Sequence, residues 1–268
     1  MTRLLLILAL LAVSVHAEEA PKADVTKGEQ AEKKRPPRNL RILPVGESPP
    51  YRQEIRDGVR YELPPPPGSV PPMEVSFVAS ETEKSGCILR MGMVSEAIPV
   101  LEGPAPVVLR NGPTTAEKAP PWITLNLPET GNVLVIVWRS DQGWAKPQWI
   151  VLGDGPEAYP AGTVRVINVS PARVALEAGP LPRLVVDSVK TGRVAVGASA
   201  GLPFRLFYQD PRSSEWKQFR NSGLAQASGE RTTFVVYRAD GVAPVEPLKT
   251  IILRERAPLF PAAPASVP

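Results

Sequence analysis

The chain contains a single histidine, His16, which lies in a segment with the features of a secretory signal peptide. Arg3 supplies the positive start, residues 4–13 form an apolar run, and Val15-His16-Ala17 provides a small-residue cleavage site. Cleavage after Ala17 would leave a mature chain without imidazole. Histidine is the side chain that most readily transfers protons near neutral pH and is the commonest metal ligand. Its absence argues against serine–histidine and cysteine–histidine catalysis and against zinc sites of the usual kind.

Cysteine and long apolar segments are also scarce. The single cysteine, Cys87, cannot form an intramolecular disulfide, and its apolar strand context predicts a buried small hydrophobe rather than an activated thiolate. No stretch after residue 17 approaches the ~20 apolar residues of a membrane span. The sequence therefore predicts an exported protein, secreted or periplasmic, with no membrane span, no metal site and no cofactor.

The net charge is small for a chain of this length. Removing Arg3 from the 31 basic residues leaves 30 against 27 acidic residues, which is a formal charge of +3 for the mature chain. This excess is too small to predict a nucleic-acid partner, despite a sequence pI near 9.3. Proline is abundant instead, with 33 residues, which is roughly twice the average usage of about 5%.

The prolines and charges concentrate toward the two ends of the chain. Residues 18–44 carry many charges and few apolar side chains, which predicts a flexible segment. Residues 45–72 include Pro64-Pro65-Pro66-Pro67, which favours an extended spacer. Residues 18–72 are therefore predicted to be a flexible basic, proline-rich leader, and the Pro/Ala-rich residues 257–268 a similar tail.

Between about residues 73 and 256 the sequence is typical of an all-β protein. Short segments rich in valine, isoleucine and aromatic residues alternate with clusters of turn-forming residues, and no window keeps a helical period. We expect two tandem antiparallel β-sandwich domains of immunoglobulin-like type, over residues 73–155 and 156–256. They would meet at the turn-rich Gly153-Asp154-Gly155-Pro156. Residues 133–138 are apolar on both faces, which predicts burial between layers or between the two domains.

Recurring segments predict that the two domains arose by duplication. Three pairs recur in the same order: residues 94–103 with 169–179, residues 136–141 with 235–240, and residues 150–152 with 251–253. The offset is 75 in the first pair and 99 and 101 in the others. This jump predicts that the second copy gained a hairpin near residues 180–200.

One strand carries a resemblance to known proteins. Residues 161–171 read Ala-Gly-Thr-Val-Arg-Val-Ile-Asn-Val-Ser-Pro and resemble the opening strand of immunoglobulin-like β-sandwich domains in uncharacterised secreted bacterial proteins. The resemblance implies a sandwich fold and brings no catalytic motif with it. The Cys…Trp…Cys spacing of true immunoglobulin domains is missing.

The candidate binding residues lie in a predicted turn among the tryptophans. Trp144 is expected to be partly exposed there, with Asp141 and Gln142 beside it. Carbohydrate-binding proteins stack aromatic rings on sugars and surround them with polar groups, so these three residues are the candidate ligand-binding tip. The alternative is that the tryptophans pack in the core.

Three functional classes follow from these features. The first is an exported, non-catalytic structural or interaction protein of the cell envelope or exterior, with a protein or an envelope polysaccharide as its partner. The second is a carbohydrate-binding module. The third is a secreted hydrolase that uses carboxylates or a serine–lysine pair. The third has the least support, because Ser214 and Lys217 follow Lys190-Thr191-Gly192, the reverse of the order in penicillin-binding enzymes.

Overall fold

A computed structural model describes residues 37–78, 84–101, 103–116, 118–241 and 244–257. The predicted signal peptide, the leader up to residue 36 and the tail beyond residue 257 lie outside the described residues. Every regular element in the described part is a β-strand, so the all-β prediction is confirmed. No helix with the length and hydropathy of a membrane span occurs among the described residues.

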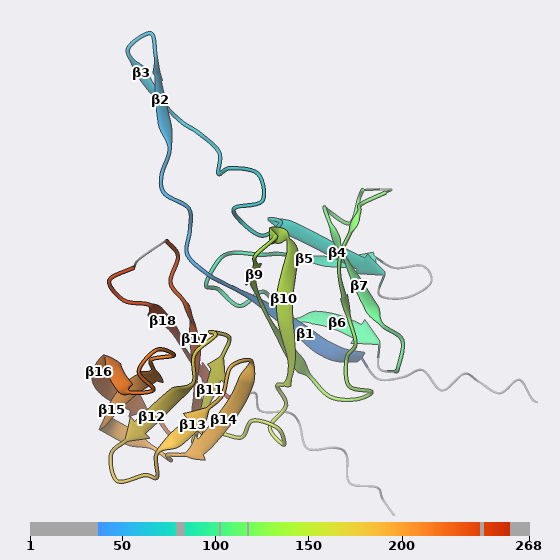
Figure 1. The fold of residues 1–268 in the computed structure, drawn as a ribbon. Coiled ribbons are helices and arrows are strands. Elements are labelled where there is room, and N and C mark those ends of the chain that lie inside the picture. Colours follow the sequence, from blue (N-terminus) through green and yellow to red (C-terminus); the bar gives the residue numbers. More distant parts are fainter. Residues whose placement is uncertain (1–36, 79–83, 102, 117, 242–243, 258–268) are drawn as a thin grey trace, which may run out of the picture. The chain divides into compact units, whose positions relative to one another are not determined.

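The first eight-stranded set, called here the N-terminal repeat, consists of two sheets (Figure 1) with the strand orders β10-β9-β1-β6 and β5-β4-β7-β8. Its strands are β1 (Pro37–Val45), β4 (Glu74–Val78), β5 (Lys84–Ile88), β6 (Ile98–Leu101), β7 (Val107–Asn111), β8 (Pro121–Leu125), β9 (Val133–Ser140) and β10 (Gly143–Gly153). Alternate residues of both sheets form one buried cluster, which includes Ile42 and Val135 from the first sheet and Phe77 and Leu109 from the second.

The second set, the C-terminal repeat, also has two sheets, with the orders β18-β17-β11-β14 and β13-β12-β15-β16. Its strands are β11 (Thr163–Asn168), β12 (Val174–Ala178), β13 (Leu184–Val186), β14 (Lys190–Ala195), β15 (Ser199–Gln209), β16 (Trp216–Gln226), β17 (Glu230–Arg238) and β18 (Leu248–Arg256). Its own buried cluster includes Val166 and Phe234 from one sheet and Leu176 and Phe204 from the other.

Both repeats follow the same strand topology. With the inserted strands β2 and β3 set aside, the first strand of each repeat lies between the fourth and the seventh, and the eighth lies beside the seventh. The recurring segments at 136–141 and 235–240 occupy equivalent places in β9 and β17, and those at 150–152 and 251–253 do so in β10 and β18. This correspondence supports duplication.

The prediction that residues 94–103 and 169–179 are equivalent in the two repeats is wrong. Residues 94–103 include β6, the fourth strand, whereas residues 169–179 include β12, the second strand of its repeat. The segment equivalent to β11 is β1, because β1 pairs with β9 in the same way as β11 pairs with β17. Leu40-Arg41-Ile42-Leu43 therefore matches Val164-Arg165-Val166-Ile167.

The flexible-leader prediction is wrong for Pro37–Val45, which forms β1 in the middle of a sheet, upstream of the predicted domain start at residue 73. Leu40 and Ile42 enter the core of the N-terminal repeat, whereas Leu43 and Val45 enter the contact with the C-terminal repeat. Apolar side chains on both faces of β1 are therefore buried. The expectation of purely antiparallel sheets is also wrong, because β1–β9 and β11–β17 are parallel pairs.

An extra hairpin, β2 (Gln53–Arg56) and β3 (Val59–Glu62), lies between the first and second strands of the N-terminal repeat. In the C-terminal repeat the same connection spans only residues 169–173. The inserted hairpin thus belongs to the first repeat, and the predicted insertion near residues 180–200 is wrong. Strands β13 and β14, which cover that region, are the counterparts of β5 and β6.

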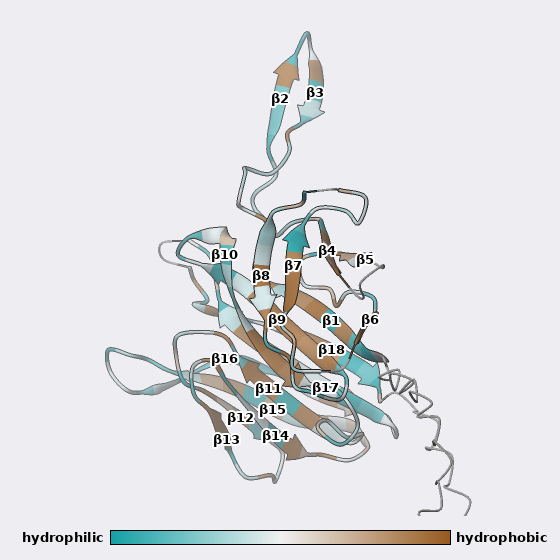
Figure 2. Ribbon diagram, turned by 90° about the vertical axis from the view of Figure 1, so that its right-hand side faces the viewer, coloured by the Kyte–Doolittle hydropathy of each residue, from teal (hydrophilic) through white to brown (hydrophobic). Residues whose placement is uncertain are grey.

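The sheets that contain β9 and β17 contact each other through a third buried cluster. Its buried members are Leu43, Val45, Leu134, Ile136, Trp138, Ile167, Val169 and Val235. Figure 2 shows the hydrophobic colouring of β1 and β9, which supply five of the eight buried members. All six residues from Val133 to Trp138 are buried, which confirms the prediction made from their apolar character.

Candidate functional site

The predicted ligand-binding tip is not assembled as expected. Asp141 and Gln142 are exposed in the β9–β10 turn. Trp144 is only 3% exposed and belongs to the core of the N-terminal repeat, so the prediction of a partly exposed ring is wrong. The backbone carbonyl of Trp144 accepts a 2.8 Å hydrogen bond from Nε1 of Trp122, which ties β10 to β8. A ring that is buried in this way has no free face to stack on a sugar.

The inserted β2–β3 hairpin presents apolar side chains that the sequence prediction missed. Tyr51 is 67% exposed, Ile55 64%, Val59 52% and Tyr61 48%. Every residue of the two strands except Glu54 is exposed. A lone two-stranded hairpin is at best marginally stable in water. Large apolar side chains concentrated on such an element are typical of a contact surface rather than of a core.

The hairpin turn shows why these residues fold locally into two strands. Asp57 and Gly58 have positive φ values of 52° and 78°, as in a type I′ turn, which suits the twist of paired strands. The alternation Val59-Arg60-Tyr61-Glu62-Leu63 follows directly. An Asp-Gly pair beside an alternating strand is a strong hairpin signal. It could have identified this element inside the proline-rich stretch.

Each strand of the hairpin keeps one edge without a neighbour in the described part of the chain. The amide of Leu63 donates to the carbonyl of Arg52, and Glu54 faces Tyr61 in the same register. Hydrogen-bonded and non-hydrogen-bonded pairs alternate along antiparallel strands. The backbone groups of Arg60 and Glu62 in β3 therefore point away from β2. Such an edge can accept a strand from a partner.

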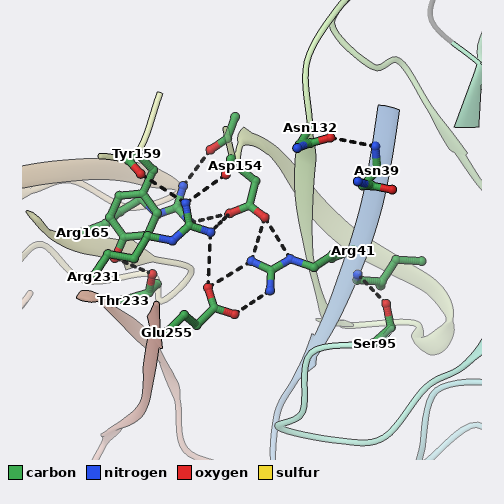
Figure 3. Close-up of polar contacts among 12 residues, drawn as sticks. Asn39, Arg41, Ser95, Asn132, Asp154, Tyr159, Arg165, Arg231, Thr233 and Glu255 are labelled. Atoms are coloured by element: carbon green, nitrogen blue, oxygen red, sulfur yellow. Dashed lines mark hydrogen bonds and ion pairs between the residues drawn. The ribbon is translucent and has the colours of Figure 1, made fainter. Parts of the chain in front are cut away.

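A buried cluster of charged side chains, separate from the hairpin, joins the two repeats. Asp154 is 5% exposed, and Figure 3 shows it among three arginine side chains. Its Oδ2 atom lies 2.7 Å from Nη2 of Arg41, and its Oδ1 atom lies 3.0 Å from Nη2 of Arg231 and 3.7 Å from Nη2 of Arg165. Glu255 completes the cluster, with Oε1 2.5 Å from Nη1 of Arg41.

This cluster repeats the symmetry of the fold. Arg41 in β1 and Arg165 in β11 hold equivalent positions, and Asp154 follows β10 at the place that Glu255 takes in β18. Arg41 contacts Glu255 across the repeats, and its counterpart Arg165 contacts Asp154 in the opposite sense. Reciprocal contacts of this kind characterise an isologous interface. The cluster therefore holds the repeats together in a defined register.

The aromatic ring of Tyr159 is part of the same cluster. The guanidinium of Arg165 lies 3.9 Å from the centre of this ring, and that of Arg231 lies 4.6 Å from it. The hydroxyl of Tyr159 is 2.9 Å from Oγ1 of Thr233. Burial lowers the pKa of Arg165, while the nearby carboxylate of Asp154 acts in the opposite direction. The ring thus stabilises positive charge that the two carboxylates do not fully balance.

Protonation of Glu255 should make the protein less stable in acid. Burial alone would raise the pKa of Glu255, but hydrogen bonds and charges from Arg41 and Arg231 outweigh it and hold the pKa below its ordinary value. A lowered folded-state pKa stabilises the fold above the unfolded value of about 4.3 and loses that effect as the pH falls below it. Melting temperatures from pH 7 to pH 3 should therefore show Glu255→Gln less stable than wild type at pH 7. The deficit, about 2–4 °C for each kcal/mol lost, should shrink toward pH 3. A constant deficit would contradict this role.

Cys87 is partly buried and packs against the core of the N-terminal repeat. It is less enclosed than the sequence predicts. Burial raises the pKa of the Cys87 thiol to about 11, while a hydrogen bond to Ser95 acts in the opposite direction. A thiol with such a pKa is almost wholly protonated near neutral pH, so a nucleophilic role receives no support.

No protein-family model matches the chain, and no curated protein matches it. One solved structure that it resembles is that of a proposed cell adhesion protein from Bacteroides ovatus. The identity is 8% and the TM-score is 0.23, over 85% of this chain and all of the other.

Proposed function

We propose that this is an exported, non-catalytic interaction protein of the cell envelope or exterior, and that the β2–β3 hairpin is its contact element. The observation that carries the proposal is the hairpin itself, which is present in one repeat only and exposes Tyr51, Ile55, Val59 and Tyr61. The unpaired edge of β3 favours a protein partner, because a partner strand satisfies backbone groups that a polysaccharide satisfies less regularly.

The arrangement of the sheets supports the finer fold assignment. In each repeat, two four-stranded sheets enclose one core, as expected for a β-sandwich. We infer that the repeats are immunoglobulin-like in this broad sense. Any more detailed fold assignment has to include the parallel pairs of first and seventh strands, β1–β9 and β11–β17.

Removing the hairpin should strongly weaken partner binding and leave the two repeats folded. Replacement of residues 51–63 by a short Gly/Ser linker removes exposed side chains, so we expect stability to change by no more than about 0.5 kcal/mol. Binding of the purified protein to envelope fractions of the producing cells should fall at least about tenfold, because exposed aromatic anchors dominate such contacts. Binding is measured by cosedimentation, and stability by thermal denaturation.

The matched control is the double substitution Asp141→Ala/Gln142→Ala, which alters the exposed turn predicted from the sequence and leaves the hairpin intact. It should bind like the wild type. Loss of binding in this control, with retained binding in the hairpin variant, would move the contact element to the β9–β10 turn. Turnover of a peptide or glycan by the purified protein would overturn the non-catalytic assignment.

A further inference from the structure

We propose that two molecules of this protein pair through the outer edge of β3, antiparallel, with Tyr61 opposite Tyr61 of the second molecule. This inference rests on the proposed function, since it identifies the partner of the hairpin as a second copy of the same chain. Three features of β3 support this register: the direction of its backbone groups, the order of its side chains and the proline that follows it.

The backbone groups of β3 fit a two-fold axis at Tyr61. Arg60 and Glu62 direct their N–H and C=O groups away from β2, whereas Tyr61 faces Glu54 in the hairpin. A two-fold axis at Tyr61 places each Arg60 opposite a Glu62 of the other molecule. Both outward-facing residues then form hydrogen-bonded pairs, and Tyr61 forms the non-hydrogen-bonded pair between them.

The side chains are self-complementary in this register. Val59, Tyr61 and Leu63 alternate with Arg60 and Glu62, so one face of β3 is apolar and the other is charged. Val59 would face Leu63 of the second molecule, and Arg60 would face Glu62, each twice because of the symmetry. Within the described residues, no hydrogen bond or ion pair engages the side chains of Arg60 and Glu62. Opposite charges facing each other on neighbouring strands stabilise their pairing.

The proposed pairing of the two β3 strands ends after Leu63. Continuing the register beyond Leu63 would place Pro64 opposite Gly58, and proline has no N–H to donate. The pairing therefore covers residues 59–63 and buries a small surface. Contacts of this size are weak on their own and become effective where molecules are concentrated on a surface.

The outer edge of β2 is less suitable. A two-fold axis at Ile55 would place Glu54 opposite Arg56, but these two side chains already form an ion pair within the same strand. The next residues to meet would be Gln53 and Asp57, and Asp57 belongs to the turn, with a positive φ. We therefore assign the contact to β3 and use β2 as the internal control.

Charge exchange tests the register. Arg60→Glu places like charges opposite each other at both symmetry-related sites, and Glu62→Arg does the same with the opposite sign. Each single variant should lose self-association at least about tenfold. An equimolar mixture of the two variants should associate again, because both sites then pair unlike charges, and so should the double variant. Association constants come from sedimentation equilibrium, with Arg56→Glu on β2 expected to behave like the wild type.

A cysteine at the proposed axis tests the same register covalently. Cα atoms of a non-hydrogen-bonded antiparallel pair lie about 4.5 Å apart, within the range that a disulfide spans. In a Cys87→Ser background, Tyr61→Cys should form a disulfide-linked dimer under mild oxidation. Ile55→Cys, on β2 at a position that is more exposed than residue 61, should form little. Thermal denaturation checks that both variants are folded.

The results that overturn the inference are also specific. Unchanged association of Arg60→Glu, failure of the mixed variants to associate, or cross-linking of Ile55→Cys in preference to Tyr61→Cys would each exclude pairing through β3. If self-association is absent while hairpin-dependent binding to envelope fractions persists, this inference fails and the proposed function stands. If hairpin removal affects neither, the proposed function fails as well.

Discussion

Substituting Trp144 by alanine is expected to lower the free energy of unfolding by about 3–5 kcal/mol, the range for truncating a large buried aromatic side chain. The ring is 3% exposed and packs in the core of the N-terminal repeat, close to Gly46. Its backbone also anchors the side chain of Trp122. For a protein of this size, the melting temperature should fall by roughly 6–20 °C. Chemical denaturation, monitored by circular dichroism, measures the change directly.

Trp149 provides the matched control, because it lies on the same strand, is 39% exposed and belongs to none of the three buried clusters. Trp149→Ala should cost less than about 1 kcal/mol. If Trp144→Ala proved as mild as Trp149→Ala and weakened binding to a glycan, the ring would be a ligand platform after all. A large loss of stability in Trp144→Ala alone would place the ring in the core.

The sequence was informative wherever the hydrophobic pattern was undisturbed by charge. Residues 133–138 are apolar without interruption, and their burial on both faces followed from that pattern. The same reasoning misses residues 40–45. This short apolar run follows the densely charged residues 18–38, so local composition assigns it with them to a flexible segment without a buried core. The pairing of β1 with β9 depends on residues about 90 positions away, which local composition does not report.

Turn chemistry was misleading in two opposite ways. Gly153-Asp154-Gly155-Pro156 indicated a turn-rich boundary between the two domains, yet Asp154 is buried there because three arginines from other strands converge on it. Asp57-Gly58 does form an exposed turn, but the surrounding prolines concealed it. A charged residue between apolar neighbours at equivalent positions, Arg41 and Arg165, was the signal that could have pointed to the buried cluster. Its meaning becomes clear only when the two strands are recognised as counterparts.

Neutralising Asp154 is the second substitution with a large expected effect. Asp154→Asn keeps the shape of the side chain and removes the charge that faces Arg41, Arg165 and Arg231. Glu255 would be the one carboxylate of the cluster left for three guanidinium groups. Removing one partner from a buried ionic cluster typically costs about 3–5 kcal/mol, because the remaining charges stay desolvated and unpaired. Differential scanning calorimetry should show a correspondingly lower melting temperature at pH 7.

An exposed ion pair between the same two repeats is a control that has the opposite charges but lacks the burial. Nη2 of Arg139 and Oδ1 of Asp240 lie 2.6 Å apart, and both side chains are substantially exposed. Asp240→Asn should therefore cost no more than about 1 kcal/mol. Adding Arg165→Met to Asp154→Asn should recover part of the lost stability, because it removes one buried charge that the first substitution leaves without a carboxylate. If Asp154→Asn and Asp240→Asn had equal effects, the buried cluster would contribute no more than a surface ion pair. The apolar contact between the sheets that contain β9 and β17 would then be the main interaction that holds the repeats together.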